Sequence, residues 1–448
     1  MSKIKQYINH LPRQVFPVFL ILIFILIHLA CPEPQKVNTS QRETTIHLEV
    51  LSTFTTTARL HISVEDTTAE WTFGLTRNGE DILTSIVYSS DTTLTDNGLN
   101  PGTQYNYQAQ WLEDGVALDT SLIAIAQTMD TTSHSFLWEI DTLGIGGSYL
   151  NDVAIIDEND VWVVGNIETD TATYNAAHWD GNEWVFYSIA PEGFFGPITA
   201  VFAFSNNDVW FGKYGLPIHF DGESFVKYSP SNGGHPGQPS IEAIWGTTSS
   251  NIYFVGDNGS IVHYEGSTFT KMASGTNTPI VDVWGRDEND IYFCQFNSTT
   301  GHSGILHYDG NQLESLYYFE SIVHNSDTLS GAIHTIWIYE DTLYAGFSSG
   351  IWKENIEHKN GVVTFWTKIF SENIYSNKII GQSNNDIFVV GNWMKMAHYN
   401  GVCWKSYANI FGNYGTYEAV DLSGNLVCAV GYTDLPKALI VVGKRISD

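Results

Sequence analysis

Cysteine is scarce in this chain of 448 residues, which has only four: Cys31, Cys294, Cys403 and Cys428. They form no Cys-x-x-Cys pair and no Cys/His spacing typical of zinc sites, so the sequence indicates neither a disulfide framework nor a zinc centre. Cys403 and Cys428 could pair only if neighbouring strands bring their Cα atoms within about 7 Å. We expect buried free thiols instead, with no metal site and no cofactor.

Basic residues are also few. The chain has 20 Lys and Arg against 49 Asp and Glu, which gives a formal net charge of -29. A chain this acidic repels a phosphate backbone, so we expect no nucleic-acid partner. The acidity alone does not indicate a bound cation, because acidic surfaces also keep exported proteins soluble.

Catalytic motifs are missing as well. The sequence has no Gly-x-Ser-x-Gly elbow, no paired glycosidase carboxylates and no sialidase-type Ser-x-Asp-x-Gly-x-Thr-Trp box. We therefore assign no catalytic residue and expect a protein that is not an enzyme.

The one long apolar run lies near the amino terminus, and nothing after residue 43 is apolar for long enough to cross a membrane. Residues 1–14 carry three basic side chains and no acid, and the apolar run from Val15 to Ala30 ends directly before Cys31. This pattern is typical of an export signal. Its apolar core is shorter than the roughly 20 residues of a comfortable membrane span, which favours a processed signal over a permanent helix.

The segment Leu29-Ala30-Cys31 resembles a bacterial lipoprotein signal, with His28 where that family usually has Leu. The resemblance implies that residues 1–30 are a signal peptide and that Cys31 is lipidated after cleavage. An uncleaved single-helix anchor is the alternative, and either form tethers the chain by the same end. Residues 31–43 are expected to be a linker. We therefore predict a membrane-anchored, extracytoplasmic protein of the cell envelope, at the outer membrane or cell surface.

The rest of the chain is predicted to be all-β. Aromatic residues make up 14% of the sequence, and Gly, Val, Ile and Thr are common. Over residues 44–129 apolar residues alternate in about seven short segments, which predicts an antiparallel sandwich. The run Leu99-Asn100-Pro101-Gly102-Thr103-Gln104-Tyr105 resembles a signature of fibronectin type III domains. This resemblance implies that the Tyr105 hydroxyl bonds to nearby backbone and that the module is a spacer.

Residues 135–448 contain one pattern seven times: an apolar strand, a turn with an acid or Asn, and a strand that opens with an aliphatic-aromatic pair. The copies lie at Asp160-Val161-Trp162, Asp208-Val209-Trp210, Asn251-Ile252-Tyr253, Asp290-Ile291-Tyr292, Leu343-Tyr344, Asp386-Ile387-Phe388 and Asn425-Leu426-Val427, the last with Val in place of the aromatic. Their spacing of roughly 40 to 50 residues is the length of a four-stranded propeller blade. We predict a seven-bladed β-propeller in which Phe136–Ile140 supplies the outer strand of the last blade. The chain resembles bacterial extracellular propellers with Val-Trp-Gly, Asp-Val-Tyr and His-Tyr-Asp-Gly repeats.

Two repeated residue types suggest chemistry but are interpreted as structural. The histidines His178, His219, His263, His307 and His398 lie on different blades, too far apart to bind one ion, so we expect local hydrogen bonds to turns. The carboxylates Asp160, Asp208, Asp290 and Asp386 close short turns, where we expect them to bond their own backbone.

The connections between second and third strands, and between blades, vary in length and share one face of a propeller. This variable face is the predicted ligand face, with candidate residues Tyr214, Asp257, Asn258, His302, Trp393, Lys395 and Tyr432. We expect Lys213 beside Tyr214 there. Exposed aromatics and amides around a depression are typical of surfaces that bind glycans or protein loops.

We therefore expect a cell-surface binding or scaffolding protein with an extracellular glycan or protein as its partner. The alternative is an extracellular polysaccharide-active hydrolase or lyase, which rests on fold analogy alone. That alternative needs an acid such as Asp257 or Glu192 at about 5 to 9 Å from a second carboxylate.

Overall fold

The computed structural model describes residues 45–446 except 66–69, 232–233, 320–331, 357–365, 373, 408–409, 411–413 and 435–436. The predicted signal peptide, the linker and Cys31 lie outside these residues. The regular elements of the described residues are β-strands and two 3-10 turns, η2 (Pro191–Gly193) and η3 (Asp257–Gly259). None of the described residues form a helix long and apolar enough to cross a bilayer.

The first domain is a sandwich of two antiparallel sheets. One sheet has the order β1-β2-β5, and the other has the order β4-β3-β6-β7, with β8 also paired to β6. The strands are β1 (Ile46–Thr53), β2 (Thr57–Val64), β3 (Trp71–Arg77), β4 (Glu80–Val87), β5 (Asp91–Asn97), β6 (Gln104–Glu113), β7 (Val116–Thr120) and β8 (Ala124–Gln127). Alternate apolar residues such as Leu60, Leu75 and Tyr107 are fully buried between the two sheets.

Two tyrosines of β6 hold the sandwich together. The Tyr105 hydroxyl accepts a hydrogen bond from the backbone N–H of Asn100 at 2.8 Å, which fastens β6 to the turn before it. The Tyr107 hydroxyl donates to Asp96 on β5 at 2.6 Å, and Arg77 on β3 pairs with the same carboxylate at 2.8 Å. Because β5 belongs to the other sheet, this cluster links the two layers.

The second domain contains, within the described residues, seven four-stranded antiparallel sheets. The first four sheets consist of β10 (Tyr149–Asp157), β11 (Asp160–Glu168), β12 (Thr173–Trp179) and β13 (Trp184–Tyr187); β14 (Ala200–Ser205), β15 (Asp208–Lys213), β16 (Leu216–Phe220) and β17 (Phe225–Lys227); β18 (Ala243–Thr248), β19 (Asn251–Gly256), β20 (Ser260–Tyr264) and β21 (Phe269–Met272); and β22 (Ile280–Asp287), β23 (Asp290–Phe296), β24 (Ser303–Tyr308) and β25 (Leu313–Phe319). The last three consist of β26 (Ile333–Tyr339), β27 (Thr342–Phe347), β28 (Gly350–Asn355) and β29 (Thr367–Phe370); β30 (Ser376–Ser383), β31 (Asp386–Gly391), β32 (Lys395–Tyr399) and β33 (Trp404–Ser406); and β34 (Gly415–Ser423), β35 (Leu426–Thr433), β36 (Ala438–Arg445) and β9 (Phe136–Leu143).

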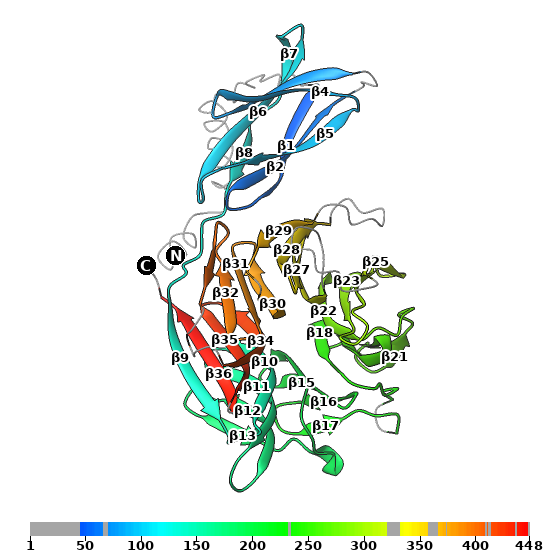
Figure 1. The fold of residues 1–448 in the computed structure, drawn as a ribbon. Helices are drawn as coiled ribbons and strands as arrows, with labels where there is room; N and C mark the ends of the chain where they lie inside the picture. Colours follow the sequence, from blue (N-terminus) through cyan, green and yellow to red (C-terminus); the bar gives the residue numbers. More distant parts are fainter. Residues whose placement is uncertain are drawn as a thin grey trace, which may run out of the picture.

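The sheets are arranged in a ring (Figure 1). Each first strand contacts the first strand of the next sheet, in the order β10, β14, β18, β22, β26, β30 and β34, and β34 contacts β10 again. Apolar residues of neighbouring sheets share cores, as where Trp162 of the first sheet packs on Phe211 of the second. This arrangement is a β-propeller.

The ring is closed by a strand from the other end of the domain. β9 pairs antiparallel with β36 along its whole length, from Phe136 opposite Arg445 to Leu143 opposite Ala438. The strand expected over 136–140 is therefore present as the outer strand of the seventh sheet and continues three residues further. Closure in this way leaves the seventh sheet with no missing strand.

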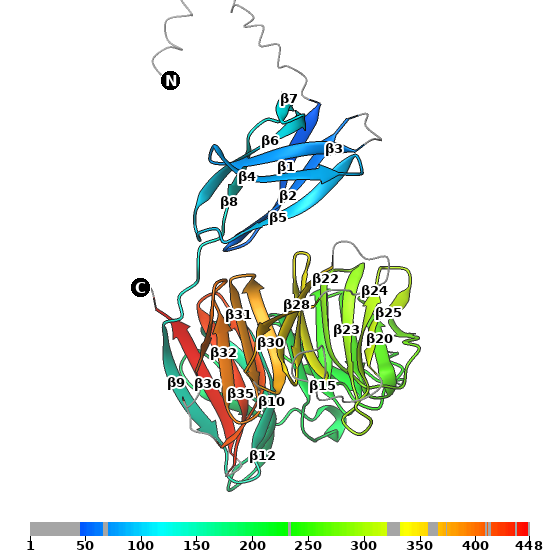
Figure 2. The ribbon, with the colours of Figure 1, turned by 45° about the horizontal axis from the view of Figure 1, so that its top comes forward.

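The sandwich lies over the short-turn face of the propeller (Figure 2). Thr132 donates to the backbone carbonyl of Asn385, and the Asn385 side-chain amide donates to the carbonyl of Asp130 at 2.6 Å. Asn385 lies in the turn between the first and second strands of the sixth sheet. The loops between second and third strands are at the opposite ends of these strands, on the face directed away from the sandwich.

Candidate functional site

Five of the sheets repeat one polar-aromatic unit, made of a residue that opens the second strand and a histidine on the third. The histidine Nε2 lies 2.6–2.9 Å from a side-chain oxygen in the pairs His178–Asp160, His219–Asp208, His263–Asn251, His307–Asp290 and His398–Asp386. Each ring also stacks on the second-strand aromatic, with centroids 4.2–4.5 Å apart, over Trp162, Trp210, Tyr253, Tyr292 and Phe388. The contacts are local, as predicted, but each partner is the side chain that opens the second strand rather than a turn.

The carboxylates behave differently from the prediction. Asp160, Asp208, Asp290 and Asp386 accept hydrogen bonds from the third-strand histidines. The reason is strand alternation: positions two apart point to the same side of a sheet, so the acid and the stacked aromatic both face the histidine. Turn N–H groups are bonded by other acids, as where Asn159 N–H donates to Asp157 at 2.7 Å. Within the described part of the chain no group of three or more His, Cys, Asp or Glu is placed to hold a metal ion.

Most of the predicted ligand residues lie in the connections between second and third strands, on the variable face; Lys395 and Tyr432 lie in strands near these connections. Tyr214 and Trp393 are 55% and 54% exposed. Both have left-handed backbones, with φ of 47° and 56°, which turns their rings out of the strand plane. Tyr214 contacts Phe194 edge-on at 5.6 Å between centroids, and Trp393 contacts Tyr375 at 5.1 Å.

The other predicted residues are spread around the same face. Asp257 and Asn258 lie in η3 of the third sheet, and His302 directly precedes β24 of the fourth. Lys395 begins β32 of the sixth sheet, and Tyr432 lies in β35 of the seventh. The structure thus brings these residues to one face but distributes them over five sheets.

Two further residues considered in the sequence analysis, Lys213 and Glu192, lie near this face. Lys213 was expected on the surface beside Tyr214 but is fully buried, where its ammonium group donates to the carbonyls of Ile189 and Phe194. Burial lowers the pKa of Lys213 to about 8, with a further contribution from Lys227. Glu192 forms an ion pair with Lys227 at 2.8 Å.

The three described cysteines are free, as expected, but only two are buried. Cys294 and Cys428 lie inside the propeller, and burial raises the pKa of both thiols. Cys403 is exposed, against the prediction. Its sulfur lies 3.6 Å from Nε2 of His134, which precedes the closing strand.

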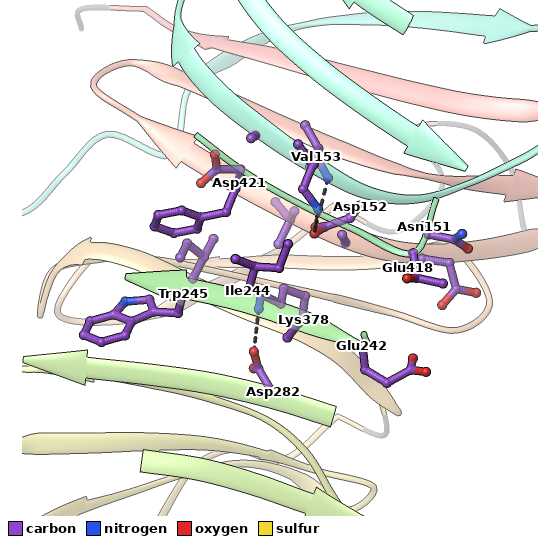
Figure 3. A pocket seen from close by; sticks show the side chains of 18 of the residues that line it. Asn151, Asp152, Val153, Glu242, Ile244, Trp245, Asp282, Lys378, Glu418 and Asp421 are labelled. Atoms are coloured by element: carbon purple, nitrogen blue, oxygen red, sulfur yellow. Dashed lines mark hydrogen bonds and ion pairs between the residues drawn. The ribbon is translucent and has the colours of Figure 1, made fainter. Parts of the chain in front are cut away.

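The sequence did not single out the cavity on the propeller axis, of about 200 Å³ (Figure 3). Its polar lining comes from the first strands of several sheets or from the residue directly before them: Asn151, Asp152, Thr199, Glu242, Asp282, Asn377, Lys378, Glu418 and Asp421. Lys378 donates to Asp282 at 2.7 Å. None of the predicted ligand residues line this cavity.

Burial shifts the pKa values of the acids in the axial cavity. It raises the pKa of Asp152 to about 7, against the opposing effects of Lys378 and backbone N–H groups. It also raises the pKa of Glu242, Glu418 and Asp421. Burial acts to lower the pKa of Lys378, but Asp282 and Asp152 outweigh it and raise that pKa overall.

The axial carboxylates tie neighbouring sheets together. Asp152 accepts a hydrogen bond from Val201 N–H of the second sheet at 2.9 Å. Asp421 accepts one from Ile155 N–H of the first sheet at 2.7 Å. Each bond satisfies a first-strand N–H on the side that faces the axis. A sequence signal for these residues exists: acids stand inside otherwise apolar strands. Burying such an acid is costly unless it finds hydrogen-bond partners, so its presence there indicates a polar contact inside the protein.

Comparisons with known proteins identify the fold. Neither a protein-family model nor a curated protein matches this chain. Its structure is similar to that of YCF48 bound to D1 peptide, with a TM-score of 0.52 and 14% identity, over 71% of this chain and 97% of that one. A chain of the mitotic checkpoint complex gives a TM-score of 0.49 and 13% identity, over 71% and 95%. The extracellular domain of a hybrid two-component system from B. thetaiotaomicron gives 0.49 and 11%, over 68% and 42%. The similarity to YCF48 concerns the fold alone: residues 136–446 are a β-propeller.

Proposed function

We propose that this protein is a cell-surface, lipid-anchored binding or scaffolding protein rather than an enzyme. In this proposal Cys31 carries the anchor, a fibronectin type III-like sandwich acts as a spacer, and a seven-bladed propeller presents its variable face to an extracellular glycan or protein. The position of the sandwich is the observation that carries the proposal. Asp130 and Thr132 bind the short-turn face through Asn385, which leaves the variable face free.

The direction of the chain supports the same orientation. β1 begins at the end of the sandwich remote from the propeller (Figure 2). A tether attached there would place the membrane, the sandwich and the propeller in that order. The exposed aromatics Tyr214 and Trp393 then face away from the membrane, where a large ligand has access.

The test is binding of the full chain, purified in detergent, to an array of glycans and surface polysaccharides, with product analysis for every hit. For a bound ligand we expect Tyr214→Asn or Trp393→Asn to weaken binding about thirtyfold, since a central aromatic contributes about 2 kcal/mol. Asn is chosen because it tolerates the left-handed backbone at both positions.

Tyr88→Asn is the matched control, because Tyr88 is 76% exposed on the sandwich. Equal loss from Tyr88→Asn and Trp393→Asn would contradict a site on the variable face. Formation of a product that a single carboxylate substitution abolishes would replace the binding proposal with the hydrolase or lyase alternative.

A further inference from the structure

The seventh sheet lacks the second-strand aromatic of the first six sheets. In the first six sheets a second-strand aromatic faces the next sheet: Trp162, Trp210, Tyr253, Tyr292, Tyr344 and Phe388. The strand register shows which residue of the seventh sheet takes this place. In the sixth sheet, Gly391 pairs with Ser376 beside a bulge, and Phe388 lies three residues before Gly391. In the seventh sheet, Gly431 pairs with Tyr417 beside the equivalent bulge, and the residue three positions before Gly431 is Cys428.

Cys428 therefore occupies the aromatic position, and the prediction from the repeat pattern that Val427 takes this place was wrong by one residue. Val427 packs toward the sixth sheet, whereas Cys428 packs toward the first. Val442 pairs with Cys428 as His398 pairs with Phe388. Two small apolar side chains thus replace the stacked aromatic and imidazole rings of the sixth sheet.

The missing rings leave space between the last and first sheets. A cavity of about 500 Å³ lies there, which we call the seam cavity. Cys428, Ile440 and Val442 line one side, and Trp179 and Trp184 of the first sheet line the other. The two tryptophans contact each other with centroids 5.6 Å apart. A volume of this size suits a small organic molecule.

The rim of the seam cavity is acidic. The exposed acids Glu139 and Asp141 of β9 and Glu158 of the first sheet line it, and Lys444 is the one lysine among its described lining residues. Lys444 is bound to Glu158 at 2.5 Å, so its charge is compensated. The two carboxylates of β9 therefore favour a cation, which a tryptophan face also attracts.

We propose that the seam cavity binds a small molecule that combines a flat aromatic ring with a positively charged amine. The ring takes the space that the aromatic-histidine pair fills in five of the other sheets, between the sulfur of Cys428 and the indoles of Trp179 and Trp184. The sulfur is a favourable neighbour for an aromatic ring. The amine lies at the rim, near Asp141 and Glu139.

The probe is tryptamine, titrated calorimetrically into the full chain, with its neutral analogue tryptophol alongside. We expect tryptamine to bind and tryptophol to bind about tenfold more weakly, because one charge contact at a partly exposed site contributes about 1.4 kcal/mol. Asp141→Asn lowers tryptamine affinity toward that of tryptophol. Asp170→Asn, which changes an exposed acid elsewhere in the first sheet, leaves it unchanged.

Cys428→Phe restores the ring that the other sheets have and fills the cavity. We expect it to weaken tryptamine binding at least about tenfold while the melting temperature stays equal or rises. Cys428→Ala is the matched control: it leaves the cavity open and removes only the sulfur contact, so we expect it to weaken binding no more than about threefold. If Cys428→Phe disturbs folding, Trp184→Ala removes one wall instead and gives the same loss.

The proposal is overturned if tryptamine gives no binding heat, or if folded Cys428→Phe and Trp184→Ala bind it as the unaltered protein does. Equal affinity for tryptamine and tryptophol refutes the cationic part. Binding of a neutral sugar such as cellobiose in place of tryptamine also overturns the proposal, in favour of a saccharide. These outcomes do not depend on the variable face, so they are separate from the test of the proposed function.

Discussion

Breaking the ion pair in the axial cavity gives a quantitative test of the propeller core. Lys378→Met removes the cation that binds Asp282 at 2.7 Å, and the Asp282 side chain is only 2% exposed. Loss of one partner from a buried pair costs about 3–5 kcal/mol. Asp282 keeps hydrogen bonds from Thr335 and from the backbone N–H groups of Val283 and Ile336. These hydrogen bonds and the 24% exposure of the Lys378 side chain reduce the penalty, so we expect a loss of about 3 kcal/mol of unfolding free energy, the low end of that range.

The measurement is urea unfolding of the propeller transition, followed by tryptophan fluorescence, in a double-mutant cycle with Asp282→Asn. Because each single variant leaves the other group unpaired, the double variant should lose about 1–2 kcal/mol less than the sum of the singles. The control is Lys444→Met. Its pair with Glu158 is shorter, at 2.5 Å, but the side chains are 61% and 57% exposed, so we expect a change within about 0.5 kcal/mol.

The reasoning is refuted if Lys444→Met costs as much as Lys378→Met, because distance rather than burial would then decide the effect. It is also refuted if the two axial substitutions are additive. In that case the 2.7 Å contact between Lys378 and Asp282 contributes no coupling energy.

Three further predictions follow from the described residues. Burial raises the pKa of Asp152 to about 7 in the folded chain, so its contribution to stability is complete below its ordinary pKa and is lost as pH rises through about 7. In unfolding titrations, the free energy of unfolding of Asp152→Asn should therefore fall about 1–2 kcal/mol less between pH 4 and 7 than that of the unaltered protein. His263→Ala removes a hydrogen bond and the stack on Tyr253 and should cost about 1–2 kcal/mol by denaturant unfolding, whereas His302→Ala, at a half-buried loop position, should cost less than about 0.5 kcal/mol. Iodoacetamide should alkylate Cys403 in the native protein and the other two described thiols only after denaturation, as mapped by peptide mass spectrometry; equal labelling of all three contradicts their burial.

The repeat pattern was sufficient to predict the propeller because each copy is a local unit. The second strand opens with an aliphatic-aromatic pair, and the third strand carries the histidine. Both strands belong to one sheet, and the hydrogen bond between them joins residues fewer than 20 positions apart, as in His178–Asp160 and His307–Asp290. The closing strand was also predictable, since Phe136–Ile140 was the segment left over when the last repeat lacked an outer strand. Tyr105 likewise lies in a short run whose contact with Asn100 spans five residues.

The sequence alone did not determine which residues meet across sheets. Asp152, Asp282 and Lys378 are far apart in the chain and converge only because the ring brings the first strands to one axis. The contact of Cys403 with His134 likewise joins residues 269 positions apart in the chain.

Strand register decided which residue of the seventh sheet takes the aromatic position. A shift of one residue exchanges the two faces of a strand, so the sequence pattern could not distinguish Val427 from Cys428 as the residue that faces the first sheet. Only the bulge and the pairing of Gly431 with Tyr417 fix that choice. The amino-acid sequence thus determined the elements and their repeat, because these depend on contacts within a sheet. The tertiary structure determined the axial ion pair and the seam cavity, because both lie between sheets and depend on ring closure and strand register.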